Sequence, residues 1–230
     1  MNAKQTIATI DQVRPLTDSI LQLRVVPDDY VEFSAGQYLH ILLAEEVEPL
    51  CFSIANAPLG ARSYELHIRH NSSNSSANRL LAEIKNTGKL AIKLPFGNCN
   101  IESLAADKPI IFIAGGTGFA QAKAMIEQLL ADSDPRKFVL FWGARTQSDL
   151  YMDDIVIRWQ EHVAHFNYHA VVSENDKKNL ADLVIEQQKN ILKESQIVLS
   201  GPFPMVHNLC ARMVDLGVAK EQFFSDAFSF

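Results

Sequence analysis

The sequence predicts two domains of different class: an N-terminal antiparallel six-stranded β-barrel over residues 1–103, followed by an α/β domain with a parallel sheet over residues 104–230. Two observations predict this organisation. Up to about residue 100, short strand-like runs follow one another with turn residues between most of them. From Pro109 onward, apolar runs alternate with helical runs. The polar stretch from Glu102 to Lys108 is the expected linker between the two domains.

The first domain is expected to contain six strands and one helix. Six short strands at this spacing are typical of a small antiparallel barrel. The helix is expected over Ala77–Lys85, where apolar residues recur at helical spacing, with Ser75 or Ser76 as its N-cap. The strands are expected at Thr6–Val13, Ile20–Val26, Gln37–Leu43, Cys51–Ile54, Tyr64–Arg69 and Leu90–Leu94.

The second domain is expected to alternate four strands with four helices. Strand and helix in alternation indicate crossover connections and a parallel sheet that is covered on both faces. The strands are expected at Ile110–Ala114, Phe138–Gly143, Tyr168–Val172 and Ile197–Ser200. The helices are expected at Phe119–Leu130, Asp149–Glu161, Leu180–Lys189 and Met205–Leu216.

Composition excludes several classes of function. The net charge of -6, without a cluster of Lys and Arg, argues against a partner that is a nucleic acid. The three cysteines form no C-x-x-C pair for zinc or an iron–sulfur cluster, so any redox chemistry must come from an organic cofactor. His162, His165 and His169 are not expected to converge on a metal ion. No signal peptide or membrane span is recognised, so no membrane partner and a cytoplasmic location are expected.

The most informative segment is Ile110–Ala122, which reads IIFIAGGTGFAQA. A buried strand that ends in glycines and turns directly into a helix leaves main-chain N–H groups at the positive end of that helix, where a pyrophosphate binds readily. The segment therefore predicts a dinucleotide site. Because position 121 is Gln rather than the third glycine of the G-x-G-x-x-G pattern, an ordinary glycine turn remains the alternative.

Several motifs follow the order found in the ferredoxin–NADP reductase superfamily, in which a barrel precedes a nucleotide-binding sheet. Within it, the sequence most resembles the bacterial NAD(P)H–flavin oxidoreductases, which include the flavin reductases of luminous bacteria. The matching segments run nearly from end to end: Ala35-Gly36-Gln37-Tyr38, Phe52-Ser53-Ile54-Ala55, Pro95-Phe96-Gly97, Ala114-Gly115-Gly116-Thr117-Gly118, Phe141-Trp142-Gly143-Ala144-Arg145, Gly201-Pro202 and Asp226-Ala227-Phe228.

The resemblance implies that the barrel binds a flavin and that Ser53 is the catalytic residue, with its hydroxyl or a nearby N–H close to flavin N5. A donor there suits the chemistry, because N5 accepts the hydride. Alternatively, Ser53 bonds only a barrel carbonyl. The implied flavin-binding residues are Leu50, Cys51, Phe52, Ser53, Ile54, His67, Ile68, Arg69 and Ser76.

One departure from the family pattern bears on how tightly the flavin is held. The family has Arg-x-aromatic-Ser here, and its arginine commonly contacts the phosphate-bearing tail of the flavin. This chain has Leu50 instead, which forfeits a charge-assisted contact of roughly 1.5 to 3 kcal/mol. We therefore expect riboflavin, FMN or FAD to come and go as a substrate. Alternatively, Arg69 or Arg79 supplies the missing charge and retains the flavin.

The second domain is implied to bind NADH or NADPH. Glu174 is expected to favour NADH, because a carboxylate repels a 2′-phosphate and accepts a hydrogen bond from a ribose hydroxyl. Lys177 and Lys178 lie close enough in sequence to blunt that preference. The implied nucleotide-side residues are Ala114, Gly115, Gly116, Thr117, Gly118, Ser173, Glu174, Gly201, Pro202 and Phe203, and Phe228 is implied to lie near the flavin ring.

The expected function is therefore hydride transfer from NADH, and also NADPH, to N5 of a free flavin. Reduced flavin would pass to a flavin-dependent monooxygenase, to iron or to oxygen. Two alternatives stay open: an electron-transfer subunit that keeps its flavin and reduces a protein partner, and a non-catalytic nucleotide sensor. The aromatic closing run, residues 223–230, is expected either to add an edge strand or to bring Phe228 and Phe230 to the flavin.

Overall fold

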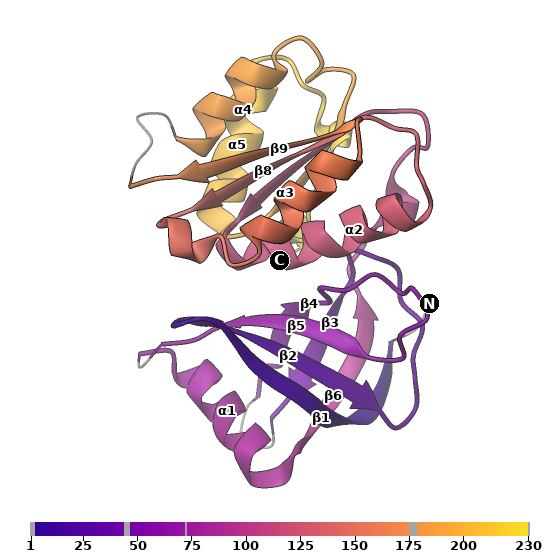
Figure 1. Ribbon diagram of the computed structural model, residues 1–230, viewed down its shortest axis with the longest axis vertical. Coiled ribbons are helices and arrows are strands. Elements are labelled where there is room, and N and C mark those ends of the chain that lie inside the picture. The colour runs from indigo at the N-terminus through magenta and orange to yellow at the C-terminus, as the bar shows by residue number, and fades with distance from the viewer. Residues whose placement is uncertain (1–2, 44–46, 72, 175–178, 230) are drawn as a thin grey trace. The chain divides into compact units, whose positions relative to one another are not determined.

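The computed structural model describes residues 3–43, 47–71, 73–174 and 179–229. By its internal contacts the chain divides into two compact units (Figure 1). The first comprises Met1–Ile101 together with Lys123–Asp132, and the second comprises Glu102–Ala122 and Ser133–Phe230. The predicted fold class, an antiparallel six-stranded sheet followed by an α/β unit with a parallel sheet, is confirmed.

The first unit is built on a six-stranded antiparallel sheet in the order β4-β3-β6-β1-β2-β5. Just beyond β4, the main-chain N–H of Ala55 donates to the carbonyl of Glu65 on β5 at 2.7 Å. This bond joins the two outermost strands of the sheet. The strands are β1 (Lys4–Thr17), β2 (Ile20–Pro27), β3 (Tyr38–Leu42), β4 (Leu50–Ser53), β5 (Tyr64–Arg69) and β6 (Lys89–Phe96).

The core of this unit follows from the alternation of apolar residues along the strands. In β3, Leu39 and Ile41 are fully buried, while the other three residues of the strand are partly exposed. Period-two burial of this kind places one face of each strand in the core. Tyr64 is also fully buried, and its hydroxyl donates to the carbonyl of Val31 at 2.8 Å, which satisfies the one polar atom of that ring.

Helix α1 (Ser75–Thr87) begins one residue earlier than a Ser75 cap would allow and two residues earlier than a Ser76 cap would allow. Its N-cap is Asn74, whose side-chain oxygen accepts from the main-chain N–H of Ala77 at 3.0 Å. The expectation of Ser75 or Ser76 as the cap was therefore wrong. Asparagine and serine cap helices about equally well, so local sequence could not decide among neighbouring polar residues.

The second unit contains a five-stranded parallel sheet in the order β11-β10-β7-β8-β9. The fifth strand comes from the aromatic closing run, which confirms that this run adds an edge strand. The strands are β7 (Ile110–Gly115), β8 (Phe138–Ala144), β9 (Phe166–Val172), β10 (Gln196–Ser200) and β11 (Phe223–Phe224), and the helices are α3 (Asp153–His162), α4 (Leu180–Gln188) and α5 (Phe203–Asp215). Helix α2 (Phe119–Ala131) begins in this unit, and its residues from Lys123 onward belong to the first unit.

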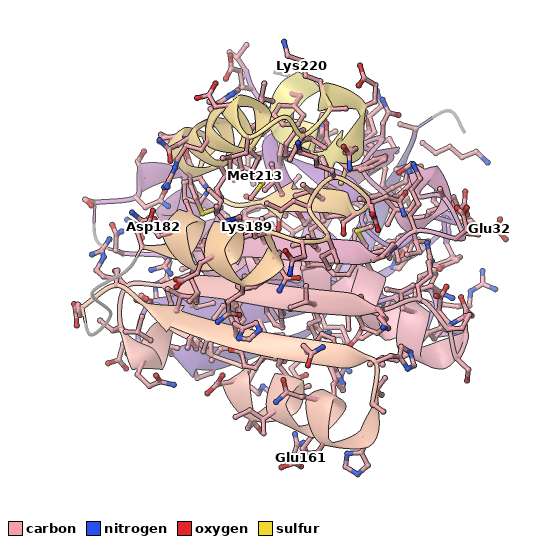
Figure 2. The ribbon with its side chains drawn as sticks, turned by 90° about the horizontal axis from the view of Figure 1, so that it is seen from above. Glu32, Glu161, Asp182, Lys189, Met213 and Lys220 are labelled. Carbon is pink, nitrogen blue, oxygen red and sulfur yellow. The ribbon has the colours of Figure 1, made fainter. Side chains whose placement is uncertain are left out.

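Helices cover both faces of the parallel sheet (Figure 1). Helices α4 and α5 pack on one face through a shared apolar cluster with β7, β8 and β10. Figure 2 labels Asp182 near the start of α4, Lys189 at its end and Met213 on α5. Asp182 pairs with Arg212 at 2.6 Å, which ties α4 to α5 at the surface. On the other face, Phe119 at the start of α2 stacks on Trp142 of β8 with ring centroids 3.8 Å apart.

Helix α3 begins at Asp153 rather than at the expected Asp149. Residues Gln147–Asp149 form a separate 3-10 turn, closed by the Asp149 carboxylate, which accepts from the main-chain N–H of Thr146 at 3.3 Å. This capping interaction uses the residue that was expected to open the helix. The acidic start of α3 instead faces β9, where the Tyr168 hydroxyl donates to Asp153 at 2.6 Å.

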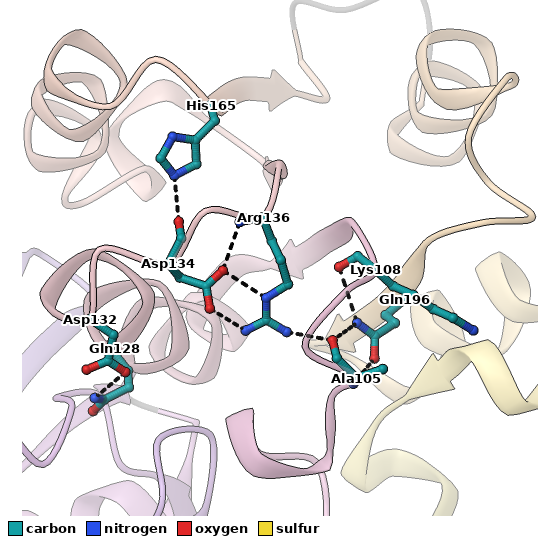
Figure 3. A network of polar contacts seen from close by, with 8 residues as sticks. All are labelled: Ala105, Lys108, Gln128, Asp132, Asp134, Arg136, His165 and Gln196. Carbon is teal, nitrogen blue, oxygen red and sulfur yellow. Dashed lines mark hydrogen bonds and ion pairs between the residues drawn. The ribbon is translucent and has the colours of Figure 1, made fainter.

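The stretch Glu102–Lys108, expected to be a linker, is held firmly within the second unit. Figure 3 shows the carbonyl of Ala105 accepting from the guanidinium of Arg136 at 2.8 Å and from the amide of Gln196 at 3.0 Å. The Arg136 guanidinium is itself paired with Asp134. The two units meet at Ile101 and Glu102, where the expected linker begins. Composition does not reveal that its main-chain groups are bound by polar side chains far along the chain.

Candidate functional site

Strand β4 directs Leu50 and Phe52 toward the core of the first unit. In the β3–β4 pair, Phe52 lies opposite Leu39 and Leu50 lies opposite Ile41, and directly opposed residues share one face of a sheet. Leu39 and Ile41 are fully buried, and Leu50 and Phe52 are partly buried against the same cluster. Both predicted flavin-site residues therefore also serve the packing of the barrel.

The alternate residues of β4, Cys51 and Ser53, lie on the outer face of the sheet. Ser53 is opposite Tyr38, whose ring lies 5.7 Å from that of Phe96 and nearly parallel to it. The outer face next to Ser53 is therefore aromatic. Within the described residues the Ser53 hydroxyl, which is partly exposed, makes no hydrogen bond, so it is available to a ligand.

Three more of the predicted flavin-site residues have buried side chains. Ile54 and Ile68 are in the barrel core, so only their main-chain groups can reach a ligand. His67 is also buried, and its Nε2 lies 2.8 Å from a carboxylate oxygen of Glu65. By contrast, Arg69 is partly exposed at the end of β5.

The start of α1 provides a further polar surface in the first unit. Ser76 lies in the first turn, which contains no acidic residue. Its hydroxyl accepts a long hydrogen bond of 3.4 Å from the guanidinium of Arg79. Because a helix start is electropositive, a first turn of this kind is compatible with an anionic group.

The first unit contains a buried cluster of charged residues. Of this cluster, the sequence analysis had singled out only His67. Lys123 of α2 lies 3.3 Å from Glu65 and 2.7 Å from Glu127. Burial raises the pKa of Glu65, but the hydrogen bond with His67 and the charge of Lys123 outweigh it and lower that pKa to about 2. Burial lowers the pKa of His67, because it disfavours the charged form of the imidazole. At neutral pH the cluster therefore has an ionised Glu65 and a neutral His67.

The glycine-rich turn of the second unit packs closely against the end of β10. A Cβ added at Gly118 would lie 2.5 Å from the main-chain carbonyl of Ser200. A Cβ added at Gly201 would lie 3.0 Å from the main chain of Gly115. Only residues without a side chain allow the ends of β7 and β10 to approach this closely. These glycines therefore form a narrow cradle lined by main-chain groups.

Two further interactions fix the shape of this cradle. The indole N–H of Trp142 donates to the carbonyl of Gly116 at 3.0 Å, and Phe119 stacks on the same indole. Among the described residues, the Oγ of Ser200 is buried and has no hydrogen-bond partner. A buried polar atom without a partner is costly unless a ligand satisfies it. The cradle and this orphaned hydroxyl together fit a pyridine nucleotide.

Beyond β9, Ser173 and Glu174 are exposed on the surface of the second unit. The main-chain N–H of Ser173 donates to the carbonyl of Ala144, and that of Glu174 donates to the carbonyl of Arg145. The sequence-based prediction did not include Arg145 in the site, although it is the first residue after β8. Lys177 and Lys178 fall outside the described residues.

Phe203 and Phe228 expose their rings on the second unit, at 50% and 43% of their full area. Phe228 belongs to a 3-10 turn, Asp226–Ser229, and its ring lies 6.1 Å from that of His207. The exposed face of an aromatic ring can pack against a planar ligand. Phe230 falls outside the described residues.

The three histidines considered for a metal site each have a separate environment. The Nδ1 of His162 lies 2.7 Å from the main-chain carbonyl of Arg158. His165 bonds the main-chain carbonyl of Asp134, as Figure 3 shows. The ring of His169 stacks on a phenylalanine of β8.

Across the described residues, no helix is both long enough and apolar enough to cross a membrane.

Comparison with known proteins identifies a nucleotide-binding domain in the second half of the chain. Residues 112–211 match the family described as "Oxidoreductase NAD-binding domain". The solved ferredoxin NADP+ reductase from Neisseria gonorrhoeae, with bound FAD and NADP, superposes with a TM-score of 0.84 at 18% identity, over 98% of this chain and 99% of that one. Residues 112–211 thus form an NAD-binding oxidoreductase domain, and the chain has a ferredoxin–NADP reductase-like fold.

Two curated relatives of this oxidoreductase differ in what their names describe. The CDP-6-deoxy-L-threo-D-glycero-4-hexulose-3-dehydrase reductase of Yersinia pestis is 30% identical over 91% of this chain, but the chain spans only 64% of that relative. The NAD(P)H-flavin reductase of Vibrio harveyi is 27% identical over 96% of this chain and 97% of its own length. The oxidoreductase therefore resembles the flavin reductase along nearly the whole of both chains.

Proposed function

We propose that this oxidoreductase passes a hydride from NADH, and less readily from NADPH, to a free flavin that enters and leaves as a substrate. The nicotinamide supplies the hydride and flavin N5 accepts it, so no general acid or base is required of the protein. The chain's own residues bind and orient the two compounds. Riboflavin, FMN and FAD all present the same ring to the residues around Ser53.

The observation that carries this proposal is the nature of residue 50. Leu50 packs against the barrel core, and it occupies the position at which the family pattern has an arginine for the flavin tail. A leucine cannot pair with phosphate, so the ring must provide most of the affinity. A ligand held mainly by its ring exchanges more readily than one that is also anchored by its tail.

The geometry described above supports the following division of roles. The Ser53 hydroxyl donates a hydrogen bond toward the flavin ring, and the aromatic face beside it excludes water from one side of that bond. The cradle of Gly115, Gly118 and Gly201 holds the pyridine nucleotide through main-chain N–H groups. Reduced flavin then passes to a flavin-dependent monooxygenase, to iron or to oxygen.

A second candidate function is that of a reductase that keeps its flavin and passes electrons to a protein partner. The similarity to the dehydrase reductase of Yersinia pestis favours it, as does Arg69, which is partly exposed on β5 and could replace the missing cation. Purification separates the two candidates. A colourless protein that oxidises NADH only when flavin is added supports the flavin reductase. A yellow protein that holds its flavin through gel filtration supports the electron-transfer subunit.

Replacing Ser53 with Ala should slow flavin reduction about tenfold without changing the fold, because one hydrogen bond to the reacting ring is lost. Steady-state oxidation of NADH with saturating flavin measures this effect. Ser19→Ala, at a partly exposed serine in the turn between β1 and β2, is the matched control and should retain wild-type turnover. If Ser53→Ala also retains wild-type turnover, the hydroxyl has no part in the reaction.

Replacing Glu174 with Arg should raise the NADPH-to-NADH ratio of kcat/KM by one to two orders of magnitude, about 1.4 kcal/mol per tenfold. The change removes a carboxylate that repels the 2′-phosphate and adds a cation that attracts it. Glu174→Gln separates these two effects and should give a smaller rise. An unchanged ratio in both variants would remove this residue from the account of nucleotide preference.

A further inference from the structure

Several main-chain groups of residues 54–57, which follow directly after Ser53, are held by hydrogen bonds. The N–H of Ile54 donates to the carbonyl of Gln37 at 3.0 Å, and the N–H of Ala55 donates to the carbonyl of Glu65 at 2.7 Å. Two charged side chains bind two further main-chain groups of this segment. Lys123 donates to the carbonyl of Ala55 at 2.9 Å, and a carboxylate oxygen of Glu127 accepts from the N–H of Ala57 at 3.1 Å.

The ammonium group of Lys123 is the centre of this arrangement. Besides the Ala55 carbonyl, its Nζ contacts a carboxylate oxygen of Glu127 at 2.7 Å and one of Glu65 at 3.3 Å. An ammonium has three N–H donors, so these three acceptors match its capacity. Lys123 therefore has a full set of partners in a single geometry.

The cost of burying this group indicates that it has a specific role. Only 6% of the Lys123 side chain is exposed, against 61% for Arg158, which makes an ion pair with the same i,i+4 spacing in α3. A buried ion pair is weak evidence for stability, because desolvation can exceed the attraction between the charges. Stability alone therefore does not account for a lysine at this position. What Lys123 adds beyond its ion pairs is a hydrogen bond to the peptide next to the flavin-site strand.

We propose that Lys123 is a positioning residue, whose ammonium is held by two carboxylates, binds the Ala55 carbonyl and thereby orients the Ser53 hydroxyl toward a bound flavin. This inference rests on the proposed function, in which Ser53 faces the flavin. Ala55 is two residues from Ser53, and both its N–H and its carbonyl are bound. Rotation of either peptide that flanks Ala55 would break one of these bonds, so the segment that follows directly after β4 has one orientation.

The test is Lys123→Met, which keeps the length and apolar stem of the side chain and removes the ammonium. The dissociation constant of FMN, measured by quenching of flavin fluorescence, should rise about tenfold, because the hydroxyl is no longer held in its binding orientation. The KM for NADH should stay within about twofold of wild type, since the nucleotide cradle belongs to other residues. Lys123→Arg restores a charged donor and should recover most of the FMN affinity.

Two controls separate this role from general stabilisation. Arg158→Met breaks an exposed ion pair of the same spacing and should bind FMN like wild type. If Lys123→Met does not fold, the double variant Lys123→Met with Glu127→Gln removes one of the two carboxylates left without their cation, while Glu65 keeps its hydrogen bond with His67, and it should show the same loss of FMN affinity. Wild-type FMN affinity in a folded variant without Lys123 overturns the inference, as does an equal loss in Arg158→Met.

The inference and the proposed function can fail separately. If the wild-type protein neither binds flavin nor oxidises NADH in its presence, the proposed function is wrong. If the wild-type protein does both and Lys123→Met does so equally well, only the positioning role is wrong.

Discussion

Replacing Leu50 with Arg should convert an exchangeable flavin into a retained one. Leu50 is partly exposed on the edge strand β4, so an arginine can place its stem against the core and its guanidinium outside. A charge-assisted contact with phosphate contributes roughly 1.5 to 3 kcal/mol, which corresponds to a fall of about 10- to 100-fold in the dissociation constant of FMN. Fluorescence quenching by titration measures this change.

Riboflavin provides a strict internal control for this variant, because it has the same ring as FMN and no phosphate. Its dissociation constant should stay within about twofold of wild type, since the introduced guanidinium would have no phosphate to pair with. Leu50→Gln controls for the polar side chain without the charge. An equal gain for riboflavin and FMN would show that residue 50 acts on the ring rather than the tail.

Replacing Gly118 with Ala should abolish most nucleotide binding while leaving flavin binding unchanged. The new Cβ would lie 2.5 Å from the carbonyl carbon and oxygen of Ser200 and 2.6 Å from the nitrogen of Gly201. All three are main-chain atoms, so the turn Gly116–Gly118 and the end of β10 must separate. Overpacking of this kind costs about 1 to 3 kcal/mol of stability, and the distorted cradle should lower the affinity for NADH by roughly 100-fold.

Gly143→Ala is the matched control for this variant. Gly143 also has an ordinary backbone conformation, but a Cβ there would meet the flexible end of Leu180 at 2.9 Å rather than main chain. Its affinity for NADH, measured by calorimetry, should remain close to wild type. If both variants bind NADH normally, the close approach at Gly118 is not what forms the nucleotide site.

The sequence was a good guide to the fold because each domain has its own apolar period. Alternating burial in β3 and the fully buried run of β7 are both visible as letter patterns. The least accurate predictions concerned ends of elements, such as Asn74 in place of a serine cap and the 3-10 turn before α3. In each case several polar residues compete for the same main-chain groups, and only tertiary context decides among them.

The candidate site was predictable only in part. The glycines of the cradle and Ser53 belong to short motifs, so the sequence indicated them directly. Lys123 and Glu65 were missed because their interaction joins residues far apart in the chain, which no local pattern encodes. One signal was present, since Lys123 stands among apolar residues in α2 with Glu127 one turn later. A charged pair within an apolar helix indicates burial, and its partners can then be sought elsewhere.

The most direct test of the central claim is where the reduced flavin is found after the reaction. The purified protein is mixed anaerobically with NADH and a many-fold excess of FMN, and small molecules are then separated by rapid filtration. The account predicts reduced FMN in the filtrate in large molar excess over protein. Reduced flavin that stays with the protein, in no more than one equivalent, would contradict the account and favour an enzyme that keeps its flavin.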